Sequence, residues 1–156
     1  MRQRQAIALL ALVGLFIAVY LWLHAIGIGG MIKCGASGGC EVVQTSRWAV
    51  FLGQPVALYG VVGYFVILIV ALAGLRPAAT VQRGWNQLLF GLATIGFIFT
   101  LYLTYLELFV IHAICRWCMG SAIIITAIWI VSLVSFKSPA LRTGHEVSPP
   151  QRGQPG

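Results

Sequence analysis

Residues 114–136 read ICRWCMGSAIIITAIWIVSLVSF, and this stretch decides the class of the protein. Cys115 and Cys118 form a CxxC motif at its start, and a long apolar run follows. One helical crossing of a bilayer needs about 20 apolar residues, so the run predicts a transmembrane helix. The CxxC spacing is typical of metal binding or of thiol exchange. The sequence therefore places a cysteine motif that could bind a metal or exchange disulfides at the start of a membrane-spanning segment.

The composition of the whole chain agrees with this interpretation. Of its 156 residues, 60% are hydrophobic and only 8% are charged, whereas soluble domains carry about 25% charged residues. The mean hydropathy is +0.94. The net charge of +7 comes from ten Lys and Arg residues that are scattered singly and form no patch able to follow phosphates. The composition thus favours a single membrane domain and argues against nucleic-acid binding.

Four apolar runs are long enough to span a bilayer, at about 6–26, 56–75, 88–109 and 114–136. The first run follows two arginines, as a signal peptide would, but it exceeds the roughly 7–15 residues of a signal h-region and lacks a small-x-small cleavage site. We therefore expect it to stay as a helix. The sequence predicts an all-α integral membrane protein, a four-transmembrane-helix bundle with an outward-facing loop between the first and second helices.

The distribution of Lys and Arg predicts the orientation of the bundle. Four crossings put both termini on one side, and cytoplasmic loops carry the excess of positive charge. On the side opposite the termini lie three positive residues, Lys33, Arg47 and Arg116. Seven lie on the side of the termini: Arg2, Arg4, Arg76, Arg83, Lys137, Arg142 and Arg152. Both termini are therefore expected in the cytoplasm. Residues 1–137 are expected to form the membrane domain, and residues 138–156, rich in Pro, Gly, Ser and Gln, a disordered cytoplasmic tail.

All four cysteines fall at the outer face in this topology, on the oxidising side where disulfides persist. Cys115 and Cys118 are expected in the first turn of the fourth helix, whose N-terminal dipole favours a reactive thiolate. Cys118 would lie about 4.5 Å deeper, so that Cys115 meets aqueous chemistry and Cys118 the apolar interior. Cys34 and Cys40 enclose a glycine-rich link, CGASGGC, whose flexibility suits a disulfide that opens and closes. The following residues, 41–48, are expected to form a short surface helix that ends near a tryptophan.

Other interpretations of these residues remain open from the sequence. Two disulfides could simply stabilise the outer face, as in a non-catalytic membrane scaffold, although a CxxC loop is too short to gain much entropy. Four cysteines could bind zinc, although this spacing at a membrane is unusual, and we expect no metal. Glu107 near the outer surface could mark the membrane boundary or be functional, because ionisable residues at such depth often are.

The order of these motifs resembles the vitamin K epoxide reductase family over roughly residues 6–136. The resemblance rests on the loop cysteine pair, on SRW six residues after its second cysteine, on LGQPVALYG at the start of the second helix and on CxxC at the start of the fourth. It implies a four-helix bundle around a quinone, in a bacterial member of the family. The DsbB-type quinone reductase, which is unrelated and does the same task, is the alternative. It is less similar, because it carries its CxxC in the first outer loop.

The resemblance implies roles for individual residues. Cys34 and Cys40 are similar to the family's shuttle pair, and Cys115 and Cys118 to its active-site pair, with Cys118 next to the quinone. The quinone-binding residues implied are Ser46, Tyr59, Tyr102, Leu103, Leu106, Glu107 and Ala122.

The resemblance also implies a reaction and a partner. A thioredoxin-fold (DsbA-like) protein outside the cytoplasmic membrane would pass electrons through both cysteine pairs to menaquinone, ubiquinone or a vitamin K-like quinone. Many bacterial relatives carry a fused thioredoxin-like domain, and this chain has no room for one, so a separate partner is expected. Vertebrate members have Asn at the position of Val56 and Tyr at that of Ala122, and these departures count against epoxide reduction.

Overall fold

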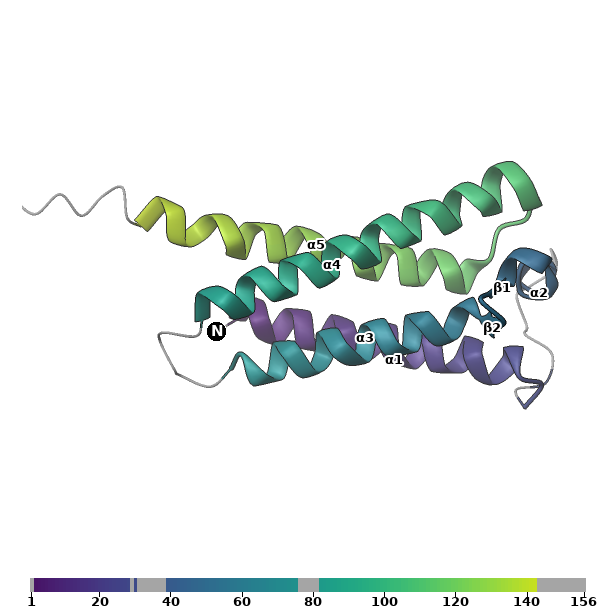
Figure 1. Ribbon diagram of the computed structural model, residues 1–156, viewed down its shortest axis with the longest axis horizontal. Coiled ribbons are helices and arrows are strands. Elements are labelled where there is room, and N and C mark those ends of the chain that lie inside the picture. The colour runs from purple at the N-terminus through teal and green to yellow at the C-terminus, as the bar shows by residue number, and fades with distance from the viewer. Residues whose placement is uncertain (1, 29, 31–38, 76–81, 143–156) are drawn as a thin grey trace, which may run out of the picture.

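The computed structural model describes residues 2–28, 30, 39–75 and 82–142, and four long helices lie side by side in it (Figure 1). Each is long and apolar enough to cross a membrane. The predicted all-α fold with four transmembrane helices is confirmed. The four helices are α1 (Arg2–Ala25), α3 (Val56–Ala73), α4 (Gln82–Tyr105) and α5 (Arg116–Arg142).

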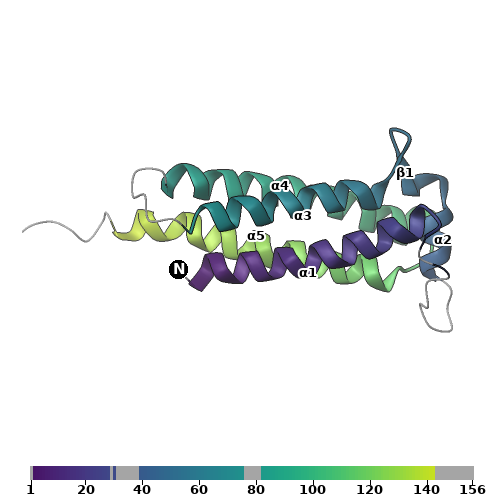
Figure 2. The ribbon, with the colours of Figure 1, turned by 90° about the horizontal axis from the view of Figure 1, so that it is seen from below.

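The short elements gather at one end of the bundle, where α4 turns back into α5 (Figures 1 and 2). They are α2 (Gly39–Thr45), the 3-10 helix η2 (Arg47–Ala49), strands β1 (Val50–Phe51) and β2 (Gln54–Pro55), and the π-helix η3 (Leu106–Ile111) that prolongs α4. The single surface helix predicted for residues 41–48 is therefore present in two pieces, α2 and η2. Ser46 separates them with an extended backbone (φ −67°, ψ 152°).

Three helix ends extend by four or more residues beyond the expected ones. α1 begins at Arg2, before residue 6, and α4 begins at Gln82, before residue 88. Hydropathy locates the lipid-immersed part of a helix, and polar residues can continue the same helix outside it. The two polar extensions are joined, because Arg4 Nη2 donates a hydrogen bond of 2.7 Å to Asn86 Oδ1.

The fourth helix also extends further than expected. α5 runs to Arg142, so residues 138–142, expected as part of a disordered tail, continue the helix. Ala140 and Leu141 are strong helix formers, whereas Pro139 is unfavourable inside a helix, so propensity alone does not explain this extension. The rest of the predicted tail, 143–156, lies outside the described residues.

The core of the bundle combines small and branched side chains from all four long helices. Small residues let transmembrane helices approach closely, which is how helices gain contact energy where lipid is as apolar as the protein. Two alanines of the core, Ala11 on α1 and Ala93 on α4, are each 0% exposed. Larger side chains on the outer faces, such as Leu9, Phe16 and Ile95, are each more than 60% exposed. This inversion of the usual exposure is expected when the surrounding solvent is lipid.

Strands β1 and β2 form a tight hairpin beside the start of α3. Val50 pairs with Pro55 and Phe51 with Gln54. The two turn residues, Leu52 and Gly53, both have positive φ (50° and 78°), as a two-residue hairpin turn requires. The Tyr59 hydroxyl on α3 donates a 3.0 Å hydrogen bond to the Phe51 carbonyl oxygen and so holds the hairpin in place.

A contact between α1, α3 and α5 carries a testable consequence for stability. The Tyr64 hydroxyl on α3 donates to the Ser121 carbonyl oxygen of α5 at 2.8 Å, and its ring covers Gly14 of α1 so closely that a Cβ there would overlap it. We expect Gly14→Ala to lower the free energy of unfolding in detergent by about 1–3 kcal/mol, because the ring must move. Gly63→Ala is the matched control, since its Cβ would meet nothing within 4 Å. Equal thermal unfolding midpoints for the two variants would contradict this packing.

Candidate functional site

The CxxC cysteines form a disulfide at the start of α5, with their Cα atoms 5.1 Å apart. Cys115 had been expected in the first turn of this helix. Because α5 begins at Arg116, Cys115 instead lies just before the helix and caps it. Its sulfur accepts a hydrogen bond from the Cys118 N–H at 3.2 Å, and its carbonyl oxygen accepts one from the Met119 N–H at 2.9 Å. These are the bonds that a serine makes at a helix N-cap. The disulfide is therefore built into the helix terminus.

The two cysteines differ in burial. Cys115 is 0% exposed, whereas Cys118 is half-buried. The expectation that Cys115 meets aqueous chemistry is wrong for this disulfide-bonded state, because α2 lies over Cys115 and helical rise along one helix does not reveal a separate segment. The greater depth of Cys118 in the membrane stays a prediction.

Helix α2 brings Cys40, the second loop cysteine, to the CxxC motif. Cys40 is 0% exposed and packs in one cluster with Cys115, Leu21 and Val43. Cys40 is itself disulfide-bonded. Cys34, the predicted partner in the loop pair, lies outside the described residues.

The approach of α2 to the CxxC motif depends on two further residues. A Cβ at Gly39 would lie 2.6 Å from the Ile114 carbonyl oxygen, so only glycine allows this approach. Five residues later, Gln44 Nε2 donates to Cys118 Sγ at 3.9 Å. One short helix thus contacts the chain at both ends of the CxxC motif.

Glu107 stabilises the segment in which the chain reverses direction between α4 and α5. It lies in η3 and is only 6% exposed. Its Oε2 accepts a hydrogen bond from the Cys115 N–H at 3.5 Å, and its carbonyl oxygen accepts bonds from the N–H groups of His112 and Ala113. His112 adopts the left-handed conformation (φ 55°) that ends the π-helix. Glu107 was expected to bind the quinone, but in the described structure its carboxylate contacts the backbone of the active-site motif.

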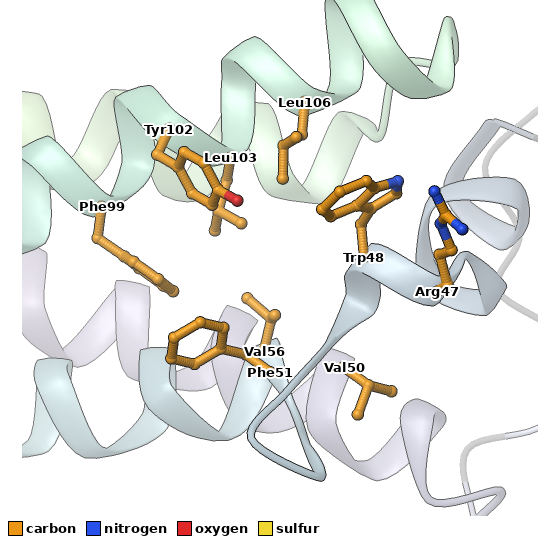
Figure 3. Close-up of a pocket in the computed structure, with 9 residues that line it drawn as sticks. All are labelled: Arg47, Trp48, Val50, Phe51, Val56, Phe99, Tyr102, Leu103 and Leu106. Atoms are coloured by element: carbon orange, nitrogen blue, oxygen red, sulfur yellow. The ribbon is translucent and has the colours of Figure 1, made fainter.

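A cavity of about 350 Å³ opens beside this site, between η2, the hairpin, α3 and α4 (Figure 3). It is mainly apolar and aromatic, and the lining residues that carry polar side-chain groups are Arg47, Trp48 and Tyr102. The Arg47 guanidinium lies 5.1 Å from the centre of the Trp48 ring. The lining residues are Arg47, Trp48, Val50, Phe51, Val56, Phe99, Tyr102, Leu103 and Leu106.

The structure brings some of the expected quinone-binding residues to this cavity and leaves others away from it. Tyr102, Leu103 and Leu106 line it, and the Tyr59 ring packs against those of Phe51 and Phe99 just behind its wall. Three others are not among the residues that line it: Glu107, described above, Ser46 and Ala122. The Ser46 hydroxyl donates to the Val43 carbonyl oxygen at 2.8 Å, and the Ala122 carbonyl oxygen accepts a bond from Thr126 inside α5.

Four lining residues were not predicted as part of the site: Arg47, Trp48, Val50 and Phe51. The resemblance had implied a quinone wall at about 96–107, which includes Phe99, and had placed Val56 where vertebrate members have Asn. Arg47 and Trp48 belong to the SRW motif, and this aromatic–basic pair after the loop cysteines was a usable signal. Val50 and Phe51 reach the cavity because the chain folds back as a hairpin after η2. No periodicity in so short a segment indicates that path.

Two segments of the chain connect the cavity with the disulfide, because each has one residue at the cavity and a nearby residue at the CxxC motif. Gln44 contacts Cys118, and Trp48, four residues later, lines the cavity. Leu106 lines the cavity, and its neighbour Glu107 contacts Cys115. Within the described part of the chain, no group of three or more His, Cys, Asp or Glu side chains is arranged to hold a metal ion.

Four membrane-spanning helices that bring a CxxC disulfide together with a second, cysteine-bearing helix define a membrane thiol–disulfide oxidoreductase. The model of the vitamin K epoxide reductase family matches residues 5–133, and the chain belongs to that family. The match covers all four helices and excludes the unrelated DsbB-type alternative. Members of this family are linked to quinones.

The close contact at Gly39 makes a prediction about the accessibility of Cys115. In Gly39→Ala the added Cβ meets the backbone oxygen of Ile114, so α2 or the reversal must move. Strain of about 1–3 kcal/mol corresponds to a roughly 5- to 150-fold larger population of the opened form. In the reduced protein, a maleimide should label Cys115 faster by that factor, as measured by mass spectrometry.

The control for this experiment is Gly91→Ala, because a Cβ there meets nothing within 4 Å. Its Cys115 should be labelled at the wild-type rate, and more slowly than Cys118. An unchanged rate in Gly39→Ala would show that α2 does not protect Cys115.

Proposed function

We propose that this protein is a quinone-dependent oxidoreductase that reoxidises a separate thioredoxin-fold protein outside the membrane and so supports disulfide formation. The observation that carries the proposal is the burial of Cys40 and Cys115 in one cluster. Two cysteines from different redox pairs that pack together can exchange disulfides directly. A purely structural pair of disulfides would have no need of this contact.

The relay runs through two exchanges. The dithiol of the partner reduces the Cys34–Cys40 disulfide and becomes oxidised. The Cys40 thiolate then attacks Cys115 Sγ, so that a Cys40–Cys115 bond forms, the Cys115–Cys118 bond breaks, and Cys118 leaves as a thiolate. Cys34 finally displaces Cys115 from Cys40, which restores the loop disulfide and leaves Cys115 and Cys118 reduced.

The surroundings of Cys118 favour its departure as a thiolate. It lies at the N-terminus of α5, where the helix dipole stabilises negative charge. The Gln44 amide donates to its sulfur, and a charged or neutral sulfur can accept that bond. These groups support Cys118 as the leaving group, and the packing of Cys40 with Cys115 in one cluster supports Cys115 as the sulfur that Cys40 attacks.

The residues around the cavity fit a quinone ring. Its volume of about 350 Å³ lies within the range of small-molecule sites, and its wall combines aromatic rings with a few polar groups. A bound quinone would supply an acceptor for two electrons and two protons. Phe99, Tyr102 and Leu103 would hold the ring, and the Arg47 guanidinium and Tyr102 hydroxyl would orient its oxygens. Val56 lines this cavity where vertebrate relatives have Asn, which favours plain quinone reduction over epoxide reduction.

The expected topology completes the proposal. The cysteines would face outward from a bacterial cytoplasmic membrane, with both termini inside, because seven of the ten Lys and Arg residues lie on the side of the termini. Residues 1–137 would then act as one membrane redox domain. A partner protein would meet the loop pair from the outer aqueous side.

The reaction is tested with purified protein in detergent, a reduced thioredoxin-fold protein as donor and menaquinone or ubiquinone as acceptor. Wild type and the neighbouring control Met119→Ala should reduce quinone, and Cys118→Ala should not. Because Cys118→Ala leaves Cys115 without its partner, a Cys40–Cys115 disulfide should accumulate and be found by non-reducing peptide mapping. Turnover in Cys118→Ala would overturn the electron path, and a Cys34–Cys115 link would overturn the order of the relay.

The quinone site is tested by filling the cavity. Leu103→Trp should raise the quinone KM roughly tenfold or more, which corresponds to about 1.4 kcal/mol of lost binding, because the indole occupies the space of the ring. Leu101→Trp is the matched control, because Leu101 is on the same helix, is 54% exposed and does not line the cavity. If both variants keep the wild-type KM, the quinone binds elsewhere.

A further inference from the structure

Glu107 is a buried carboxylate that the relay described above does not use. It lies on η3, the π-helical segment that follows α4. Such π-helical turns are found often at functional sites. Tyr105 and Leu108 on either side are 56% and 47% exposed, whereas Leu106 and Glu107 are each 6% exposed. The π-helix thus carries the carboxylate inward, toward the CxxC motif and away from water.

A role as a simple anchor does not explain why this group is a carboxylic acid. Among the described residues, its carboxylate has one hydrogen-bond donor, the Cys115 N–H at 3.5 Å. A neutral amide oxygen accepts such a bond equally well and avoids the cost of burying a charge. The main-chain carbonyl of Glu107 already ties the reversal through His112 and Ala113. The property that a carboxylate adds is the ability to accept a proton.

Among the described residues, the site offers no other evident proton acceptor. Cys40 and Cys115 are both 0% exposed, so water has little access to the attacking thiol. Thiols ordinarily ionise near pH ~8.5, and at neutral pH the attacking cysteine must lose its proton. The described charged and imidazole groups on the surrounding elements are His24, which is half-buried at the end of α1, and Glu41, Arg47, His112 and Arg116, which are exposed. Of these described groups, Glu107 alone combines burial with a hydrogen bond to the motif that is attacked.

We infer that Glu107 is the base that accepts the proton of the Cys40 thiol as Cys40 attacks Cys115. The inference rests on the proposed relay and deepens it. In this step the S–H bond of Cys40 breaks and its proton passes to the Glu107 carboxylate. The sulfur of Cys40 forms a bond to Cys115 Sγ, and the electron pair of the Cys115–Cys118 bond stays on Cys118. When the Cys34 thiolate displaces Cys115, the Glu107 carboxyl returns its proton to the departing Cys115 sulfur.

The experiment follows the thiol exchange without quinone, so that binding in the cavity does not affect it. Oxidised protein is mixed with a reduced thioredoxin-fold dithiol and quenched in acid, and the free thiols are alkylated. Mass spectrometry then gives the rate at which Cys115 and Cys118 become reduced. A variant with both Cys34 and Cys40 replaced by Ser measures and corrects for direct reduction by the donor.

Glu107→Gln separates proton transfer from positioning, because the amide oxygen still accepts the Cys115 N–H. We expect the exchange rate at pH 7 to fall roughly 100-fold, the lower range for general acid–base catalysis, and to recover as the pH rises through the range where thiols ionise. Glu107→Asp keeps a carboxylate and should retain most of the pH profile of the wild type. If Glu107→Gln folds poorly, the Asp variant and the solvent deuterium isotope effect of the wild type still report on proton transfer.

The outcomes separate the two proposals. A Gln variant with the wild-type rate and pH profile would overturn the role of Glu107 and leave the relay intact. A slower Gln variant with an unchanged pH profile would reduce Glu107 to a positioning residue and overturn the inference. A wild type that transfers no electrons from the loop pair to the CxxC motif would overturn the relay and the inference together.

Discussion

The contact between α2 and the reversal that precedes α5 is the constraint on which the rest of the site depends. Gly39 has no Cβ, and a Cβ there would stand 2.6 Å from the Ile114 carbonyl oxygen. This close approach buries Cys40 against Cys115 and brings Gln44 to Cys118. It also sets the direction in which the chain leaves α2 for η2 and the hairpin, and these segments form one side of the cavity. The disulfide and the cavity are therefore coupled through one short helix.

Because this contact is buried, the few polar groups around it act on the sulfurs with little competition from water. A dry site slows proton exchange with water and strengthens each electrostatic interaction inside it. In the proposed relay, the thiol chemistry would depend on groups that the fold supplies: the N-terminus of α5, the Gln44 amide and the Glu107 carboxylate. Each of these comes from a different element, α5, α2 and η3. The bundle is a rigid frame that holds the three together at one end.

Particular residues show where interpretation of the sequence succeeded and where it failed. The apolar runs predicted all four membrane helices, because lipid demands about 20 apolar residues in each, and the motif order indicated the family that the family model confirms. The polar starts of α1 and α4 were missed, because they are stabilised by a long-range bond between Arg4 and Asn86. The expected access of water to Cys115 was wrong, because a segment 75 positions earlier in the chain, at Cys40, covers Cys115.

The sequence by itself determined the membrane class, the number of spans and the cysteine motifs, because each follows from local composition and spacing along the chain. Only the tertiary structure decided which cysteines pack in one cluster, which carboxylate binds the backbone of the CxxC motif and which side chains enclose the cavity. These depend on segments far apart in the sequence, such as Gly39 beside Ile114, or Trp48 and Leu106 on the wall of one cavity. A local pattern specifies a helix and its apolar face. The packing of one helix on another specifies the site.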